Sequence, residues 1–230
     1  MHNYQGIPKM VVCKDLEHIQ HFQKSALTIG SLDGMHQGHL GIISDLKAIS
    51  KLNNIPSVVI TFDPHPKTVL QESHKTIKCL LGIDNKIDFL KQHAVDYLWI
   101  IPFDKIFSKI SAREFLEKYI FTYFNPFDII VGYDHHFGFN RKGDNNFLYD
   151  NKKEYGYNLH IKEPILYNNI PINSSRIRTY LNRGNIDKAN DCLGWEYGFS
   201  GKIVKGQGIA TKLEFPTANI SPHISNQLIP

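Results

Sequence analysis

An apolar run, a turn rich in glycine and histidine, and then a helical pattern follow one another near the start of this chain. Residues 26–29 form the apolar run, and apolar side chains recur at helical spacing through residues 40–49. The turn between them reads Ser31-Leu32-Asp33-Gly34-Met35-His36-Gln37-Gly38-His39. A helix that begins beside His39 directs its unpaired N–H groups and the positive end of its dipole at the space above the strand. This junction suits a polyphosphate, because Gly38 allows close approach and both imidazoles can donate hydrogen bonds. Taken alone, the motif fits a glycine turn with two solvated histidines equally well.

Strand and helix patterns alternate from about residue 27 to residue 166. Short apolar or β-branched runs predict strands at 57–62, 97–101, 127–132 and 159–161. Helical patterns lie around residues 85–92 and after Ser111, which forms a capping-box pattern with Glu114. The alternation predicts an α/β fold, with a parallel, Rossmann-like sheet covered by helices on both faces. Ligands of such sheets bind at the carboxyl ends of the strands, where the histidine motif lies.

The pattern changes after about residue 195. Residues 197–204 alternate as in a strand, and glycines follow at 206 and 208. We therefore expect a first domain over residues 1–185, and a linker with the start of an antiparallel β-barrel domain over residues 186–230. The 35 residues after position 195 are too few for an independent barrel core, so we expect the chain to stop inside that domain.

Composition narrows the classes of function. The net charge of +4 suits an anionic substrate, and no run of five basic residues indicates nucleic-acid binding. Three scattered cysteines lack metal-ligand spacing and predict reduced thiols. The N-terminus lacks a leader pattern, and the longest mostly apolar stretch, residues 97–103, is too short to cross a membrane. We expect a cytoplasmic protein that acts without a membrane.

A second motif, Pro171-Ile172-Asn173-Ser174-Ser175-Arg176-Ile177-Arg178, opens another helical pattern. Ser174 or Ser175 is expected to cap that helix. Backbone N–H groups, two hydroxyls and a guanidinium would then converge on one anion. On its own, this motif fits a capped surface helix with exposed arginines.

Together the two motifs resemble the nucleotidylyltransferase superfamily, which has a His-x-Gly-His motif early and an Ile-Ser-Ser-Thr-x-x-Arg-like motif late. More specifically, the chain resembles the prokaryotic bifunctional riboflavin kinase/FAD synthetases. Further matching segments are Phe62-Asp63-Pro64-His65-Pro66, Val131-Gly132-Tyr133-Asp134-His135-His136-Phe137-Gly138, Arg141-Lys142-Gly143-Asp144 and Phe215-Pro216-Thr217-Ala218-Asn219. His135-His136 departs from the family's usual Phe-Arg.

The resemblance implies transfer of AMP from ATP to FMN, which gives FAD and pyrophosphate, with Mg²⁺ bridging phosphate oxygens. It assigns the catalytic roles to His36, His39 and Arg178. The ATP-binding residues that it implies are Gly30, Asp33, Gly34, Gly38, Ser174, Ser175 and Arg176. It points to Asp63, His65 and Asp134 for the flavin, although turn or capping roles suit all three equally well.

Residues Thr217 and Asn219 match the metal-binding positions of the riboflavin kinase signature. Because the expected barrel is incomplete, riboflavin phosphorylation is expected to be absent. The small-molecule partners implied are thus ATP and FMN, and riboflavin only if kinase activity remains.

Three alternatives stay open at this point. The chain could adenylylate another acceptor, such as nicotinamide mononucleotide or phosphopantetheine. It could be a remnant that binds flavin or nucleotide without catalysis. Its 12 histidines could also indicate a metal-binding protein.

Overall fold

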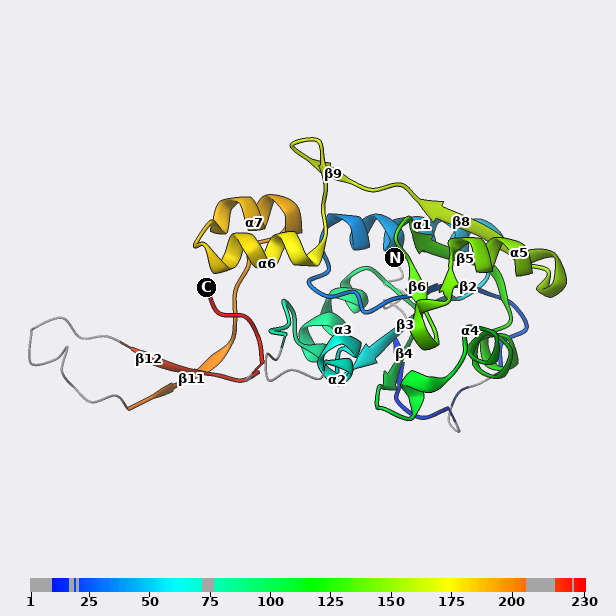
Figure 1. Cartoon of the computed structure of the whole chain (residues 1–230), viewed down its shortest axis with the longest axis horizontal. Coiled ribbons are helices and arrows are strands. Elements are labelled where there is room, and N and C mark those ends of the chain that lie inside the picture. Colours follow the sequence, from blue (N-terminus) through cyan, green and yellow to red (C-terminus); the bar gives the residue numbers. More distant parts are fainter. Residues whose placement is uncertain (1–9, 17–18, 20, 72–76, 206–217, 225) are drawn as a thin grey trace, which may run out of the picture.

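The computed structural model describes residues 10–16, 19, 21–71, 77–205, 218–224 and 226–230. Its centre is a six-stranded sheet in which all neighbouring strands are parallel (Figure 1). From one edge to the other, the strands are β1 (Val11–Cys13), β4 (Tyr97–Pro102), β3 (Ser57–Asp63), β2 (Ser25–Ile29), β5 (Pro126–Gly132) and β8 (Asn158–Lys162). The predicted α/β class and parallel sheet are confirmed, and each strand run expected between residues 26 and 166 belongs to this sheet.

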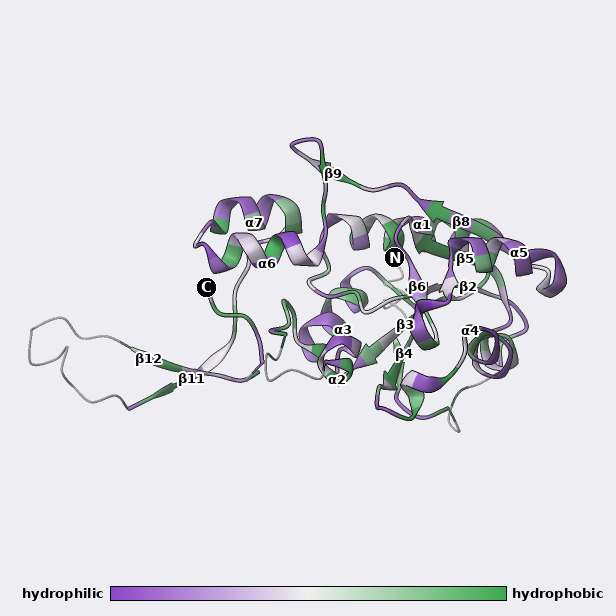
Figure 2. Cartoon of the chain, viewed as in Figure 1, coloured by the Kyte–Doolittle hydropathy of each residue, from purple (hydrophilic) through white to green (hydrophobic). Residues whose placement is uncertain are grey.

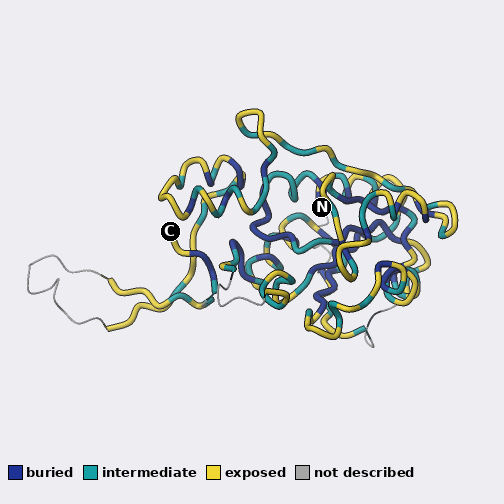
Figure 3. Tube along the Cα trace, viewed as in Figure 1, coloured by how far each residue is buried: buried dark blue, intermediate teal, exposed yellow. Residues whose placement is uncertain are grey.

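The four central strands of the sheet are buried on both faces and are apolar nearly throughout, as parallel strands are when helices cover them (Figures 2 and 3). Successive residues alternate between two cores: Leu27 packs in one and Ala26 in the other. One core receives side chains of α1 (Gln37–Asn53) and α3 (Ile83–Gln92). The other receives side chains of α4 (Ala112–Phe115), of the π-helical η3 (Leu116–Phe124) and of α5 (Asn145–Tyr155).

Several short elements lie in the loops that connect these strands and helices. The helical ones are α2 (Pro66–Leu70) and the 3₁₀ turns η2 (Phe107–Lys109) and η4 (Phe139–Arg141). Two antiparallel pairs join β6 (His136–Phe137) with β7 (Gly143–Asp144), and β9 (Leu166–Tyr167) with β10 (Ile170–Pro171). Ser111 caps the helix that follows it, as predicted, because the Ser111 hydroxyl accepts a hydrogen bond from the Glu114 N–H at 3.1 Å.

A third core lies beside the sheet, where α6 (Ser174–Asn182) and α7 (Ile186–Leu193) pack side by side (Figure 1). The buried side chains of this core include Leu80 and Leu228, which come from distant parts of the chain. Beyond α7, β11 (Gly201–Val204) pairs antiparallel with β12 (Asn219–Pro222) and extends away from the sheet. This pair agrees with the expected antiparallel β segment, although β11 covers only the second half of the strand expected at 197–204. The domain boundary expected between residues 185 and 186 falls between α6 and α7, and these two helices pack on each other. The boundary stays a prediction.

None of the helices in the described part of the chain combines the length and the apolar character that crossing a bilayer requires.

Candidate active site

The loop from β2 to α1 is shaped by two glycines. Gly34 has a φ of +82°, and a Cβ at this position would lie 2.8 Å from a methyl carbon of Leu80. A Cβ on Gly38 would lie 3.2 Å from the imidazole of His36. The loop therefore requires glycine at Gly34, and it leaves room for the His36 ring at Gly38. Gly30 is different, because a Cβ there would make only ordinary contacts with Leu32.

The two histidines of the first motif stack on each other at the start of α1. Their ring centroids lie 3.7 Å apart with an interplanar angle of 17°, and His36 caps the helix by accepting a weak hydrogen bond from the His39 N–H at 3.4 Å. Burial lowers the pKa of His36 to about 4 against an opposing effect of Asp33. Burial, His36 and Lys86 together lower the pKa of His39 well below its usual value. Both imidazoles are therefore neutral at pH 7 and act as N–H donors rather than as cations.

The second motif meets the first at Asp33. Ser174 donates its hydroxyl to the Asp33 carbonyl at 2.9 Å, across 141 residues of sequence. The expectation that Ser174 or Ser175 caps α6 is wrong: Asn173 is the N-cap, and its side-chain oxygen accepts from the Arg176 N–H at 2.9 Å. Asn173 and a serine are equivalent as caps, and the Ser174 hydroxyl is engaged by the loop. Ser175 is exposed.

A buried ion pair joins Arg178 to the Asp33 carboxylate. The Arg178 Nε also donates to the Lys78 carbonyl at 2.8 Å, and the second carboxylate oxygen of Asp33 accepts from the Leu80 N–H at 2.9 Å. In the described part of the chain the Nη1 of Arg178 makes no hydrogen bond. The structure thus brings Arg178, Ser174 and the histidine loop to one place at the carboxyl end of β2.

Arg176 lies apart from this group. Its guanidinium packs 5.4 Å from the ring centroids of both Tyr167 and Tyr180. It donates to the carbonyls of Tyr167 at 3.0 Å and Ile170 at 2.8 Å, and to the Tyr180 hydroxyl at 2.9 Å. Arg176 therefore ties the β9–β10 hairpin to α6, and its contribution to ATP binding stays a prediction.

The end of β3 contributes the next group of side chains. His65 caps α2 by accepting from the Lys67 N–H at 3.1 Å. Burial lowers the pKa of His65 to about 4, and the charges of Asp33, Arg178 and Lys86 also act on it. His65 is therefore close to the first two motifs. Asp63 is exposed at the last position of β3.

Asp134 is exposed in the loop after β5, also at the carboxyl edge of the sheet. The neighbouring His135 has a buried Nε2 without a hydrogen-bond partner in the described part of the chain, and burial lowers its pKa to about 4. A flavin role for Asp63, His65 and Asp134 stays a prediction.

Two parts of the site were missed by the sequence reasoning. The first is Lys86 on α3, a buried lysine that donates to the Ser31 carbonyl at 2.6 Å and to the Thr61 hydroxyl at 3.2 Å. Its sequence signal was a lysine in register with Ile83 and Leu90, on the apolar face of a helix.

The second is a short segment near the end of the described chain. Residues 226–228 run parallel to residues 78–80: Cys79 donates its N–H to Asn226 at 2.9 Å, and Leu228 donates its N–H to Cys79 at 2.8 Å. The Leu228 carbonyl also accepts from the Tyr197 hydroxyl at 2.6 Å. This segment supports the two residues, Lys78 and Leu80, whose backbone groups hold the Asp33–Arg178 pair. No local sequence pattern signals a pairing over this distance.

The kinase signature is described only in part. Asn219 is exposed on β12, whereas Thr217 lies outside the described residues.

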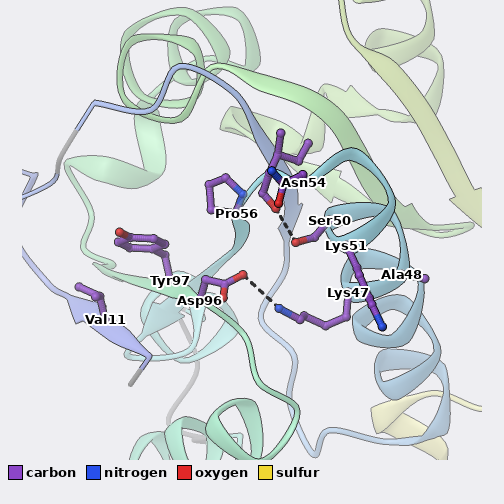
Figure 4. Close-up of a pocket in the computed structure, with 10 residues that line it drawn as sticks. Val11, Lys47, Ala48, Ser50, Lys51, Asn54, Pro56, Asp96 and Tyr97 are labelled. Carbon is purple, nitrogen blue, oxygen red and sulfur yellow. Dashed lines mark hydrogen bonds and ion pairs between the residues drawn. The ribbon is translucent and has the colours of Figure 1, made fainter. Parts of the chain in front are cut away.

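A hollow of about 710 Å³ lies at the amino ends of the parallel strands, where β3 and β4 begin, opposite the candidate site (Figure 4). Lys47 reaches across it to Asp96 at 3.0 Å, and Asp96 also accepts from the Ser57 hydroxyl at 2.6 Å. These hydrogen bonds, with burial opposing them, lower the pKa of Asp96. The polar groups here satisfy one another and join α1 to the strand ends. Across the described residues, no group of three His, Cys, Asp or Glu side chains is placed to hold a metal ion.

The profile of the FAD synthetase family matches residues 18–176, more than half of the chain. The chain belongs to the FAD synthetase family. The matched range contains the β2–α1 loop, the ends of β3 and β5, and the start of α6. The riboflavin kinase profile matches residues 193–230, so the chain also carries part of a riboflavin kinase domain.

Curated relatives agree with this family. A bifunctional riboflavin kinase/FMN adenylyltransferase of Buchnera aphidicola subsp. Schizaphis graminum is 38% identical over 202 residues, which are 86% of this chain and 63% of the relative. The protein of the same name from Escherichia coli K12 is 29% identical over 84% of this chain and 62% of the relative. The chain thus spans less than two thirds of the length of these relatives.

Among solved structures, a protein of Streptococcus pneumoniae described as a macrolide-efflux protein matches with a TM-score of 0.82 and 26% identity. The match covers 96% of this chain and 71% of that chain. This structural match supports the fold described above over nearly the whole chain.

Proposed function

We propose that this chain transfers AMP from ATP to the phosphate of FMN and releases pyrophosphate. The observation that carries the proposal is the meeting of the two phosphate-binding motifs at Asp33, through Ser174 and Arg178. Membership of the FAD synthetase family supports FMN as the acceptor over another mononucleotide. The Phe62–Pro66 segment, which resembles a segment of the bifunctional riboflavin kinase/FAD synthetases, lies at the same edge of the sheet.

In this reaction an oxygen of the FMN phosphate attacks the α-phosphorus of ATP in line. The bond from the α-phosphorus to the bridging oxygen breaks, and pyrophosphate leaves with both electrons of that bond. Because the nucleophile is already an anion, the protein needs no general base for the attack. Catalysis then depends on positioning and on stabilising the charge that develops on the phosphoryl oxygens.

Each residue of the site has a place in that scheme. His36 and His39, held neutral by burial, donate N–H groups to phosphate oxygens beside the N-terminus of α1. The free Nη1 of Arg178 contacts the β- and γ-phosphates, and its charge stabilises the leaving pyrophosphate. Asp33 orients Arg178 and stays away from the phosphates, because both of its carboxylate oxygens are already engaged.

The donor set fits a magnesium ion that is held mainly through the nucleotide. Asp33, the buried carboxylate of the site, is occupied by Arg178 and Leu80. Mg²⁺ commonly retains several waters and binds through substrate phosphates. The residues that bind the triphosphate would therefore hold the ion indirectly, and the ion would neutralise phosphate charge.

The direct test is to incubate the purified chain with FMN, ATP and Mg²⁺, and to separate the flavins by HPLC while pyrophosphate release is measured. FAD and pyrophosphate formed in equal amounts would support the proposal. FMN or ATP binding without FAD formation would favour a binding remnant instead. Parallel reactions with nicotinamide mononucleotide, phosphopantetheine and riboflavin test the other acceptors, and riboflavin separately reports the second activity named for the relatives.

A further inference from the structure

Lys86 is buried at the centre of the candidate site, and among the described residues it has no ion-pair partner. The residue is 5% exposed, and in the described part of the chain no carboxylate lies within ion-pair distance of its Nζ. Burying an unpaired ammonium is costly, and a neutral side chain could tether the same carbonyl at lower cost. A positive charge at this position therefore calls for a reason beyond packing.

The hydrogen bonds of Lys86 join two strand ends. Its Nζ donates to the Ser31 carbonyl at 2.6 Å, just after β2, and to the Thr61 hydroxyl at 3.2 Å, near the end of β3. The Thr61 hydroxyl donates to the same Ser31 carbonyl at 3.2 Å. Two of the three ammonium N–H groups are thus used within the described residues, and the third remains for an acceptor from outside them.

The charge of Lys86 acts on the residues that face the proposed substrates. It contributes to lowering the pKa of both His39 and His65. Its ammonium interacts electrostatically with five groups, which lie on four segments around it. These groups are Asp33, His39, Asp63, His65 and Cys79.

We propose that Lys86 is a positioning residue for adenylyl transfer, whose buried ammonium joins the ends of β2 and β3 and holds a positive charge behind the histidines, toward the nucleotide phosphates. The inference rests on the proposed function. Burial lowers the pKa of Lys86 to about 8, partly opposed by Asp33 and Asp63. At pH 7 about nine tenths of the side chain is then charged, and the charge is lost as the pH rises through 8.

The experiment compares Lys86→Arg and Lys86→Met with the wild type, using Lys91→Met as a matched control on the exposed side of the same helix. ATP affinity is measured by calorimetry, and FAD formation by HPLC, from pH 6.5 to 9.5. Outer-shell groups that orient metal ligands are typically worth about 10–100-fold, and Lys86 would act at the same remove from the reacting atoms. We therefore expect Lys86→Met to reduce kcat/KM for ATP by about 10–100-fold at pH 7, and Lys91→Met to leave it unchanged.

The pH profile distinguishes the effect of the Lys86 charge from the effect of its hydrogen bonds, because a neutral lysine still donates N–H groups to Ser31 and Thr61. In the wild type, kcat/KM and ATP affinity should fall above pH 8. The decrease in kcat should lie at higher pH, because bound phosphates favour the charged form of Lys86. Lys86→Arg, which stays charged, should lose this alkaline decrease. An unchanged decrease in Lys86→Arg, or wild-type kcat/KM in Lys86→Met, would overturn the inference. If Lys86→Met does not fold, the arginine variant alone decides.

The two proposals fail differently. A wild-type chain that binds ATP with the expected pH dependence but makes no FAD contradicts adenylyl transfer and supports Lys86 only as a charge that holds the nucleotide. FAD formation without an alkaline decrease contradicts the role of Lys86 alone.

Discussion

The ion pair between Asp33 and Arg178 provides a quantitative test of how the two motifs are joined. Asp33 is 3% exposed and the Arg178 side chain 15% exposed. Removing one member of a buried pair leaves the other charge uncompensated and typically costs about 3–5 kcal/mol. For a chain of this size, each kcal/mol lowers Tm by about 2–4 °C. We therefore expect Asp33→Asn and Arg178→Met each to lower Tm by about 6–20 °C.

A double-mutant cycle isolates the contribution of the pair. In the double variant neither charge of the pair is left without its partner, so its loss of stability should be smaller than the sum of the single losses. We expect a coupling free energy of at least about 2 kcal/mol, from urea unfolding at pH 7. The Asp88–Lys91 pair on α3 is the control, because its side chains are 65% and 49% exposed. Exposed pairs of this kind are worth about 0.2–1 kcal/mol.

Additivity would refute the reasoning. If the two single losses sum to the double loss within about 0.5 kcal/mol, the residues do not interact in solution. The second motif would then lack its charged link to the first, and the shared triphosphate site would lose its main structural support. The Ser174 hydroxyl bonds to a backbone carbonyl of Asp33, so the cycle leaves that contact in place.

Three further predictions address other parts of the site. His39→Ala should lower kcat for FAD formation by roughly 10²–10³-fold, as loss of one preorganised donor does elsewhere, and near-wild-type turnover would contradict a catalytic role. Leu228→Ala should cost about 2–5 kcal/mol in urea unfolding and weaken ATP binding, whereas Ile229→Ala at an exposed position should do neither. Because the folded pKa of His36 is about 4, below the ordinary value near 6.5, its neutral form stabilises the fold at neutral pH. We expect about 3 kcal/mol of that stability to be lost as the pH falls from 6.5 to 4. His36→Gln should remove this share of the pH dependence, while His39, His65 and His135 keep theirs, and an unchanged slope would contradict the prediction.

The sheet could be predicted from the sequence because its strands are short, continuous apolar runs. Such runs carry the signal of burial on both faces, and the parallel arrangement follows from the helices between them. The junction at residues 31–39 could be predicted for a similar reason, since the end of β2 and the start of α1 are both local patterns.

Contacts between distant segments could not be predicted in the same way. Asn173 and Ser174 are both good capping residues, and the choice between them depends on the Asp33 carbonyl, 141 residues from Ser174. The pairing of Cys79 with residues 226–228 has no local pattern. Lys86 did leave a signal, a charged residue on an apolar helix face, but its partners become evident only when β2 and β3 lie side by side.

The charges of the site are arranged to be balanced by an anion. Arg178 and Lys86 are cations from different helices, and Asp33 is the buried carboxylate near both of them. Among these three groups the balance is positive, while the exposed Asp63 also acts on Lys86; two neutral histidines and the start of α1 offer N–H groups at the same edge. Without an anion that positive balance is costly, because burial penalises an uncompensated cation. A nucleotide triphosphate would supply the missing negative charge. The buried ammonium of Lys86, which weakens the empty fold, would therefore strengthen a complex with a nucleotide triphosphate.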